Sequence, residues 1–382
     1  MAFEFIQAAL QQRRVDSLLR ARHVIADSSD ARFLTNKEGK QYLNFASNDY
    51  LGLGSKLELQ GGLTGSRSSA LVTGYQQCHK DFEATLCKHF GYESALLFST
   101  GFSANSSVIK SLFSQSTGAK AALDSAIFQD KLNHASLIDG ALQSDAKHIR
   151  FNHNDMGHLR QRLEKSKAAN KLIISEGVFS MDGDSAPLKQ LMELKQQHNA
   201  WLMLDDAHSF GVLGENGLGS VGLGCKPEIL VITFGKAMAC QGAAVLASKT
   251  VIDFLLQFNR DYIYSTSMSP LMVQAAEQQF LRVLDASEQR QHLFSNIALF
   301  KQLCADANIP VMPSETAIQP VVLGSAENAL SAQTKLKEQG IWLTAIRPPT
   351  VPHNTSRLRV TITAAHTHDD IEKLVSALKV SI

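Results

Sequence analysis

Short apolar runs alternate with helical stretches through the middle of the chain, and this alternation limits the possible folds more than any other feature. Helical sequence begins at 79–90 and fills most of the gaps between the runs. The runs with the length and composition of buried strands are 94–98, 119–123, 148–151, 172–175, 201–204, 229–234 and 243–247. Strands that alternate with helices pair mostly in parallel and are covered on both faces. The pattern predicts an α/β fold built on a mostly parallel, seven-stranded sheet.

The two ends of the chain follow a different pattern. Further helices are expected at 3–22, 270–284, 288–307, 326–339 and 368–379. Further strands are expected at 32–34, 41–45, 318–323, 342–345 and 357–362. Because 382 residues exceed what one hydrophobic core usually serves, we expect more than one domain. The expected parts are an N-terminal helix with short strands (1–45), a large domain (46–285) and a smaller α+β C-terminal domain (286–382).

Composition excludes several classes of protein. Hydrophobic residues make up 44% of the chain and charged residues 19%, as in ordinary globular proteins. A net charge of +1 without a basic stripe argues against a nucleic-acid partner. The five cysteines form no CxxC pair, which argues against disulfides and structural zinc. The N-terminal sequence lacks the features of a signal peptide and no apolar run reaches transmembrane length, so we expect a cytoplasmic protein without metal or membrane partner.

Two of the predicted strands end in chemically capable residues. The segment LMLDDAHSFG (202–211) supplies Asp205, Asp206 and His208, and VITFGKA (231–237) supplies Thr233 and Lys236. Ligands of open α/β sheets bind at the carboxyl ends of the strands, so these groups are expected in one crevice. A carboxylate, an imidazole and a lone lysine fit pyridoxal 5′-phosphate, which needs a lysine for its aldehyde and a partner for its ring nitrogen.

The lysine and the aspartates each have a plainer interpretation. Most lysines are solvated surface charges, but Lys236 follows an apolar strand, where desolvation favours a neutral, nucleophilic amine. Aspartates at strand ends often cap helices or bind loop amides. Alternation of side chains along a strand lets only one of Asp205 and Asp206 face a ring, and periodicity does not choose between them.

Other motifs carry less weight as bare sequence. STGFSAN (99–105) follows a strand and opens a helix, so it suits a phosphate, although a capped helix start explains the same letters. The hydroxyls of 265–267 could serve a phosphate too. His134 could lie on an aromatic ring, although a lone histidine is more often structural. Arginine clamps carboxylates, and the candidates among the often exposed C-terminal arginines are Arg347, Arg357 and Arg359.

Taken together, these strings resemble the α-oxoamine synthases, a pyridoxal-phosphate family with the aspartate-aminotransferase-like fold (fold type I). The matching strings occur in the order of that family and span almost the whole chain. They are NFASNDYLGL (44–53), LLFSTGFSAN (96–105), LNHASL (132–137), EGVFSMDGDSAPL (176–188), LMLDDAHSFGVLGE (202–215), VITFGKA (231–237), IYSTSMSP (263–270) and TAIRPPTVP (344–352). The resemblance makes 46–285 the domain that binds pyridoxal 5′-phosphate.

The resemblance implies roles for individual residues around the cofactor. Lys236 corresponds to the lysine that bonds the aldehyde, Asp205 to the partner of the ring nitrogen, and His208 to the donor near the phenolic oxygen. His134 matches the stacked imidazole, and with the first three it forms the catalytic set. The other implied cofactor contacts are Gly101, Phe102, Ser180, Thr233 and Thr266. Thr266 matches a residue that reaches the phosphate of the other subunit, which implies a homodimer with shared sites.

The resemblance also implies a reaction and its substrate contacts. The reaction is the decarboxylative condensation of L-alanine with a pimeloyl thioester, on coenzyme A or acyl carrier protein, in biotin biosynthesis. Arg20 and Thr350 match contacts to the acyl substrate, Arg359 matches the arginine that holds the amino-acid carboxylate, and Asn48 is assigned to the substrate as well. The alternatives are a related synthase that uses glycine or serine, and a catalytically impaired protein that keeps the cofactor fold.

One segment departs from the family pattern. Between NDYLGL and VTGY (72–75) the family carries a longer, glycine-rich segment, and here only 54–71 intervenes. This segment lies near the substrate entrance in the family, so its shortening bears on acyl-chain handling. Ala237 and Ala239 stand where the family often has glycine after the lysine, which is expected to stiffen that turn.

Overall fold

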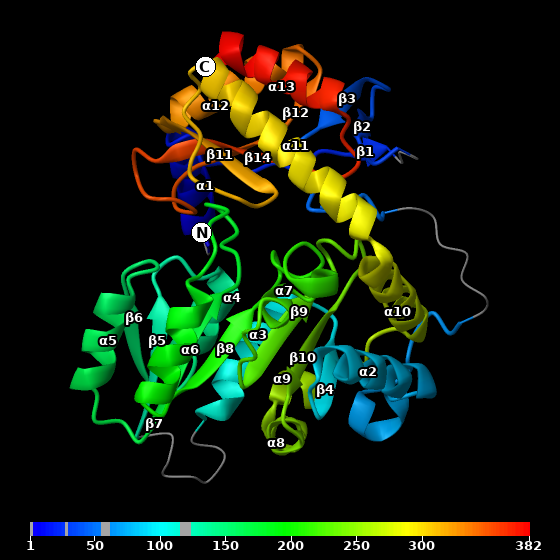
Figure 1. Cartoon of the computed structure of the whole chain (residues 1–382), viewed down its shortest axis with the longest axis vertical. Coiled ribbons are helices and arrows are strands. Elements are labelled where there is room, and N and C mark those ends of the chain that lie inside the picture. The colour runs from blue at the N-terminus through cyan, green and yellow to red at the C-terminus, as the bar shows by residue number, and fades with distance from the viewer. Residues whose placement is uncertain (1–2, 27–29, 55–61, 115–123) are drawn as a thin grey trace. The chain divides into compact units, whose positions relative to one another are not determined.

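The structure, a computed structural model, describes residues 3–26, 30–54, 62–114 and 124–382. Tertiary contacts divide the chain into two compact units (Figure 1). Unit 1 comprises Met1–Ser55, Met181–Asp184 and Glu288–Ile382, and unit 2 comprises Lys56–Ser180 and Ser185–Ser287. The expected domain division at 45 and 285 stays a prediction.

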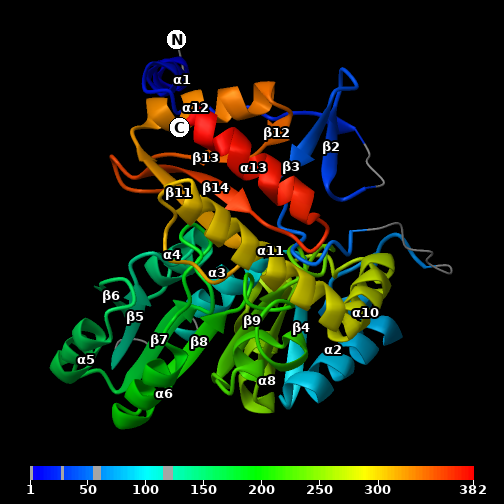
Figure 2. The ribbon, with the colours of Figure 1, turned by 45° about the horizontal axis from the view of Figure 1, so that its top comes forward.

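Unit 2 is built on a seven-stranded sheet, as the alternation of runs predicts (Figure 2). The strands lie in the order β4 (Ser94–Phe98), β10 (Ala243–Ala247), β9 (Ile229–Thr233), β8 (Trp201–Asp205), β7 (Asn170–Glu176), β5 (Ser125–Asp130) and β6 (Lys147–Phe151). β10 runs antiparallel to both of its neighbours, and the other pairs are parallel. The predicted α/β class with a mostly parallel sheet is therefore confirmed.

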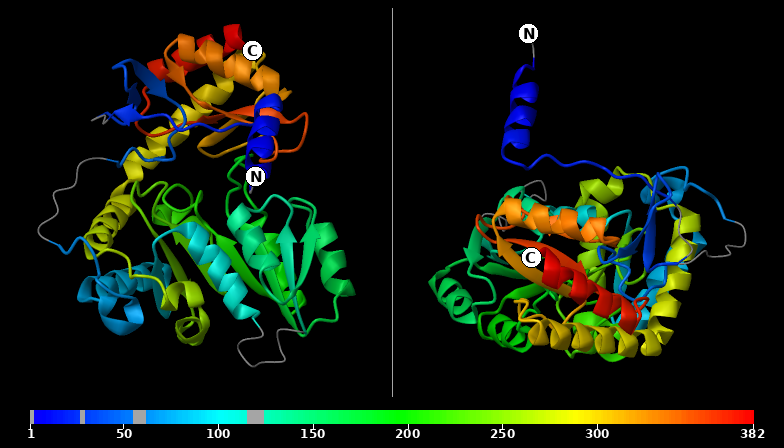
Figure 3. Two further views of the ribbon diagram at one scale, coloured as in Figure 1. Left: turned by 180° about the vertical axis from the view of Figure 1, so that it is seen from behind. Right: turned by 90° about the horizontal axis from the view of Figure 1, so that it is seen from above.

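Helices cover both faces of this sheet (Figure 3, left). They are α2 (Gln77–Phe90), α3 (Gly101–Leu112), α4 (Ala135–Leu142), α5 (Met156–Lys165), α6 (Leu188–Gln197), α7 (Gly219–Gly222), α8 (Lys249–Phe258), α9 (Arg260–Ile263) and α10 (Pro270–Asp285). The apolar sides of α3, α4 and α8 share one buried cluster with strand residues such as Ile174, Met203 and Val231. Elsewhere Phe82 of α2 packs against Phe234 with ring centroids 5.5 Å apart. Because helices cover both faces of the sheet, its strands are buried on both sides, which explains the continuous apolar runs of the sequence.

Unit 1 joins the two ends of the chain around two small sheets. One sheet has the order β1 (Ile25–Ala26), β2 (Phe33–Asn36), β3 (Gln41–Asn44) and β12 (Ile341–Trp342), and the other has β11 (Ile318–Gly324), β14 (Ser356–Thr361) and β13 (Thr344–Ile346). The helices are α1 (Phe5–Val15), α11 (Ser287–Asp306), α12 (Ala326–Glu338) and α13 (His368–Ser381). β3 pairs in parallel with β12, almost 300 positions later in the chain, so the N-terminal strands complete a C-terminal sheet.

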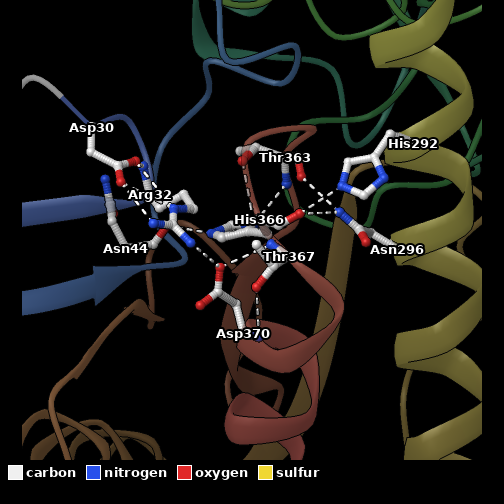
Figure 4. A network of polar contacts seen from close by, with 9 residues as sticks. All are labelled: Asp30, Arg32, Asn44, His292, Asn296, Thr363, His366, Thr367 and Asp370. Carbon is white, nitrogen blue, oxygen red and sulfur yellow. Dashed lines mark hydrogen bonds and ion pairs between the residues drawn. The ribbon is translucent and has the colours of Figure 1, made fainter.

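A polar network centred on His366 holds these distant segments of unit 1 together (Figure 4). The Thr363 N–H donates to His366 Nδ1 at 3.0 Å, and His366 Nε2 lies 3.1 Å from the carbonyl oxygen of Asn44. The imidazole stacks on Phe45 with centroids 4.1 Å apart. Asn296 of α11 donates to the carbonyl of His366 at 2.8 Å. The network links the strand β3 to α11 and to the turn before α13.

Two sequence-based expectations need correction or fall outside the described residues. The helix expected over 3–22 ends at Val15, and none of its residues is buried. Ser17 follows with a positive φ of 56°, which ends the helical path. The strand expected at 119–123 lies outside the described residues. β5 was not predicted, because its buried residues include the polar Gln129 and Asp130.

All five cysteines are free. Among the described residues, no helix combines the length and the apolar character that spanning a membrane requires. The expected cytoplasmic location stays a prediction.

Candidate active site

A cavity of about 250 Å³ lies in unit 2 where strands of the large sheet end. Its walls come from the turn between β4 and α3, the turn between β5 and α4, and the ends of β7, β8 and β9. The residues that line it are Ser99, Thr100, Gly101, Phe102, Asn105, His134, Ser136, Glu176, Asp205, Ala207, His208, Thr233, Gly235, Lys236, Cys240, Gln241 and Gly242. The two segments that the sequence singled out, at the ends of β8 and β9, therefore meet in one cavity.

The two adjacent aspartates at the end of β8 have different surroundings. Asp205 lines the cavity, and its Oδ2 accepts from Asn105 Nδ2 at 2.6 Å while its Oδ1 accepts from the Ala207 N–H at 2.9 Å. Asp206 is fully buried away from the cavity lining, where it accepts from the Ser209 hydroxyl at 2.6 Å and the Ser220 N–H at 2.7 Å. The structure thus places Asp205 in the cavity. Asp206 instead binds groups of the following loops, which is the common use of an aspartate at the end of a strand.

Burial governs the acidity of both carboxyl groups. Burial raises the pKa of Asp205, and the hydrogen bond from Asn105 opposes that rise. Burial also raises the pKa of Asp206 to about 6, against the hydrogen bonds from Ser209 and Ser220. A buried carboxylate favours a proton on a nitrogen that faces it, because the two opposite charges offset the cost of burial.

Glu176 is a second carboxyl group in the cavity. It lies opposite Asp205 on the neighbouring strand, and one of its oxygens accepts from the His134 N–H. Burial raises the pKa of Glu176 well above its usual value, and the nearby charge of Asp205 raises it further. Two adjacent buried carboxyl groups resist being charged together.

Lys236 lies in a tight turn directly after β9. The Ala239 N–H donates to the carbonyl of Lys236 at 2.7 Å, and the Cys240 N–H donates to the carbonyl of Phe234 at 2.9 Å. Ala239 has a positive φ of 47°, a conformation that glycine adopts more easily. These bonds fix the backbone, so the half-buried lysine extends from a defined point of the cavity wall.

The turn from β4 into α3 forms a cradle for an anion. Thr100 caps α3 by accepting from the Ser103 N–H at 3.1 Å, and the helix begins at Gly101. A Cβ at Gly101 would lie 2.4 Å from Cγ2 of Thr233, so only glycine fits. Within the described structure the Thr233 hydroxyl oxygen is buried and has no hydrogen-bond partner. A helix N-terminus and an unpaired hydroxyl beside it are groups that a phosphate would satisfy.

Of the remaining cofactor residues expected from the sequence, all but Ser180 line one of two cavities in unit 2. His208 and Phe102 line the same cavity as Lys236, whereas Ser180 is not among its lining residues. Thr266 lines a second cavity of unit 2, of about 190 Å³, together with Tyr262. Ser99 lines both cavities.

The expected substrate residues all lie in unit 1. Arg20 donates to the Thr350 hydroxyl at 3.3 Å, and both line a cavity of about 720 Å³ with Trp342. Arg359 donates to Asn48 Oδ1 at 3.2 Å. The structure therefore brings Arg20 to Thr350, and Arg359 to Asn48, from opposite ends of the chain.

Several cavity residues, among them Asn105, Ser136 and Glu176, carried no assignment from the sequence. All three belong to strings that match the family. Their residue types are common on surfaces, and only the pairing of β7 with β8 brings Glu176 beside Asp205. No signal in one sequence reports such a neighbour across a sheet.

The comparisons with known proteins agree with this geometry. The family model described as "Aminotransferase class I and II" matches residues 40–378. The chain belongs to the class I and II aminotransferase family. As a member of that family it is similar to the 8-amino-7-oxononanoate synthase of Vibrio cholerae serotype O1, with 46% identity over 98% of this chain and 96% of that protein. It is similar in the same way to that of Saccharophagus degradans, with 45% identity over 98% of this chain and 95% of that protein.

A solved structure extends the likeness to the fold. A lysine-to-alanine variant of a serine palmitoyltransferase from S. paucimobilis, with a bound PLP–myriocin aldimine, has a TM-score of 0.89 and 27% sequence identity. The match covers 99% of this chain and 97% of that one. The predicted aspartate-aminotransferase-like class is confirmed by the family match and by this likeness.

Proposed function

We propose that this chain catalyses the decarboxylative condensation of L-alanine with a pimeloyl thioester, giving 8-amino-7-oxononanoate, CO2 and a free thiol in biotin biosynthesis. Two relatives named 8-amino-7-oxononanoate synthase, similar along almost the whole chain, support this reaction. The observation that carries the proposal is the cavity in which Lys236, Asp205 and His134 lie beside the cradle at Gly101. The chain is accordingly an acyltransferase that uses pyridoxal 5′-phosphate.

The residues present fit that cofactor. When bound, pyridoxal 5′-phosphate supplies an electron sink for negative charge at the α-carbon of an amino acid. Lys236 would hold the cofactor aldehyde and then carry the α-proton, and Asp205 would hold a proton on the ring nitrogen. The backbone at Gly101 would bind the phosphate. His134 would lie against the ring, and His208 would donate to its phenolic oxygen.

The substrate contacts belong to the proposal as well. We assign the alanine carboxylate to Arg359, because a guanidinium binds a carboxylate through two parallel hydrogen bonds. Asn48, which accepts from that guanidinium, would hold it in place. We assign the acyl chain to Arg20 and Thr350, whose cavity is lined by apolar residues such as Trp342.

We further propose that two copies of the chain form a homodimer with shared sites. Ser69 and Thr266 form a β-bridge, and the adjoining segments expose Leu71, Val72 and Tyr264 at 50%, 73% and 72%. Apolar side chains exposed together are typical of a surface that another chain covers. In the dimer Thr266 would reach the phosphate in the partner's cavity. Analytical ultracentrifugation is expected to give twice the mass of the chain, and a monomeric holoenzyme would contradict this arrangement.

Thiol release is the test of the reaction. The holoenzyme is offered pimeloyl-CoA and the pimeloyl-carrier protein in turn, each with L-alanine, glycine or L-serine. The proposal predicts release of free thiol with L-alanine and at least one acyl donor, and a product with the mass of 8-amino-7-oxononanoate. Preference for glycine or serine would assign the chain to a different synthase, and cofactor binding without thiol release would favour an impaired enzyme.

A further inference from the structure

Four polar residues form a continuous chain of hydrogen bonds in the cavity of unit 2. His134 Nδ1 lies 2.8 Å from the Ser136 hydroxyl, and Ser136 accepts from Asn105 Nδ2 at 3.0 Å. The same Asn105 nitrogen donates to Asp205 Oδ2 at 2.6 Å. Asn105, Ser136 and Asp205 are buried, with exposed fractions of 1%, 0% and 4%. The chain therefore runs from the imidazole expected against the cofactor ring to the carboxylate expected at the ring nitrogen.

The carboxylate decides how the asparagine amide is oriented. Asp205 already accepts from the Ala207 N–H on its other oxygen, so it acts as an acceptor on both sides. Asn105 must then turn its NH2 group toward Asp205, since its carbonyl oxygen has no hydrogen to offer. One hydrogen of that group goes to Asp205 and the other to Ser136, which uses both donors of the amide.

The amide in turn decides where the serine hydrogen goes. The Ser136 oxygen accepts from Asn105, so its own hydroxyl hydrogen is left for Nδ1 of His134. The Ser136 N–H also donates to this nitrogen, at 3.3 Å. A ring nitrogen that receives two donors presents its lone pair, so the neutral imidazole carries its hydrogen on Nε2.

The assignment depends on Asp205 as an acceptor. Asp205 accepts from Asn105 on Oδ2 and from the Ala207 N–H on Oδ1. Glu176 lies across the sheet from Asp205 and accepts from the backbone N–H of His134. An Asp205 that donated instead would reverse every bond of the chain as far as His134.

We propose that Asn105 is a positioning residue that selects the Nε2–H tautomer of His134 through the hydroxyl of Ser136 while it holds the carboxylate of Asp205. The inference rests on the proposed function, since the tautomer of His134 gains its importance from the ring that the imidazole would lie against. Neither Asn105 nor Ser136 needs to touch the substrate.

The tautomer can be measured directly by ¹⁵N NMR of holoenzyme labelled at histidine. The His134 signals are assigned by their loss in His134→Gln. We expect the Nε2–H form in the wild-type protein and a mixture of tautomers in Asn105→Ala and Ser136→Ala. The dissociation constant of pyridoxal 5′-phosphate is expected to rise about tenfold in Asn105→Ala, because Asp205 loses a charge-assisted donor.

Two variants separate positioning from general damage to the fold. Ser136→Thr keeps the hydroxyl and is expected to keep the wild-type tautomer. Asn259→Ala is the matched control, since Asn259 is fully buried and donates to Ser107 of the same helix α3 at 2.9 Å, outside the cavity. It is expected to lower the melting temperature without changing the His134 signals.

Two outcomes would overturn the inference. One is an Nδ1–H tautomer in the wild-type holoenzyme, and the other is a wild-type tautomer that persists in Asn105→Ala. Thiol release is scored separately on the same samples. A tautomer that responds to Asn105 in a protein that binds the cofactor but releases no thiol would uphold the positioning role and reject the proposed reaction.

Discussion

At the scale of single residues, neighbouring side chains of one type carry different tasks. Asp205 and Asp206 are adjacent in sequence and both buried, yet one lines the cavity and the other binds Ser209 and Ser220. Asp206 makes its hydrogen bonds within the protein and away from the cavity, so its replacement should mainly lower the stability of the fold. Asp205 faces the cavity, so its replacement should mainly lower the activity.

Asparagine at each position tests this difference. Asp205→Asn is expected to lower kcat at least a hundredfold, the scale of one well-placed electrostatic contact. Asp206→Asn is expected to lower the free energy of unfolding by about 1–3 kcal/mol, because buried partners lose a charged acceptor. Kinetics and thermal denaturation of both variants provide the measurement. Equal loss of activity at equal stability in the two variants would contradict the assignment.

Gly101 offers a second test at this scale. Gly101→Ala is expected to weaken pyridoxal 5′-phosphate binding at least tenfold, because the new methyl group would lie 2.4 Å from Cγ2 of Thr233. The double variant Gly101→Ala with Thr233→Ser removes that Cγ2 and keeps the hydroxyl. Titration of the apoprotein with the cofactor should show partial recovery in the double variant. A double variant as weak as Gly101→Ala would show that the clash with Thr233 is not the cause.

At the scale of elements, the network around His366 joins β3 to the turn before α13 in unit 1. Burial lowers the pKa of His366 to about 4 from its usual 6.5, while Asp370 and Asp30 raise it and Arg32 lowers it. The imidazole is neutral in the fold, where Nδ1 accepts from the Thr363 N–H. A proton on Nδ1 would remove that bond.

Stability of unit 1 is therefore expected to depend on pH. Because the folded pKa lies below the unfolded one, the unfolded chain binds more protons between pH 6.5 and 4. The contribution of His366 is fully present above pH 6.5 and is lost as the pH falls toward 4, by about 3 kcal/mol. Trp342 lies in unit 1 and Trp201 in unit 2, so Trp342 fluorescence in a Trp201→Phe background reports unit 1.

The measurement is the urea midpoint of that fluorescence change across this pH range. His366→Gln should be less stable at pH 7 and should show a shallower decline below pH 6.5. Equal slopes in the two proteins would assign the pH dependence to groups other than His366.

The sequence predicted elements whose pattern is local and missed those that depend on distant partners. The strand endings at Lys236 and Asp205 were identified because apolar runs give way to polar residues there. β5 was missed because its polar residues are buried by neighbouring strands, which no local pattern shows. The helix expected over 3–22 is too long because the helix ends at Val15 and Ser17 takes a positive φ, a local break that the amphipathic pattern does not show.

The site shows the same limit. Residue type and spacing pointed to Lys236 and to one of two aspartates, and the resemblance selected Asp205. The roles of Asn105, Ser136 and Glu176 depend on hydrogen bonds across four separate segments. Such bonds follow from the folded arrangement of α3, the start of α4, β7 and β8, so only the structure could suggest them.

At the scale of the whole molecule, the chain is a member of the class I and II aminotransferase family whose two units each hold part of the proposed machinery. Unit 2 carries the cavity for the cofactor, and unit 1 carries the arginines assigned to the substrates. Lys236 is the residue on which the proposed reaction depends most, because it would hold the cofactor and move the α-proton.

The most direct test compares the wild-type protein with Lys236→Ala in the presence of L-alanine and pimeloyl-CoA or the pimeloyl-carrier protein. The account predicts that the wild-type protein shows the visible absorbance of lysine-bound pyridoxal 5′-phosphate and releases thiol together with 8-amino-7-oxononanoate. Lys236→Ala should remain folded and lose both signals. A wild-type protein without that absorbance, or a Lys236→Ala variant that still turns over, would contradict the account.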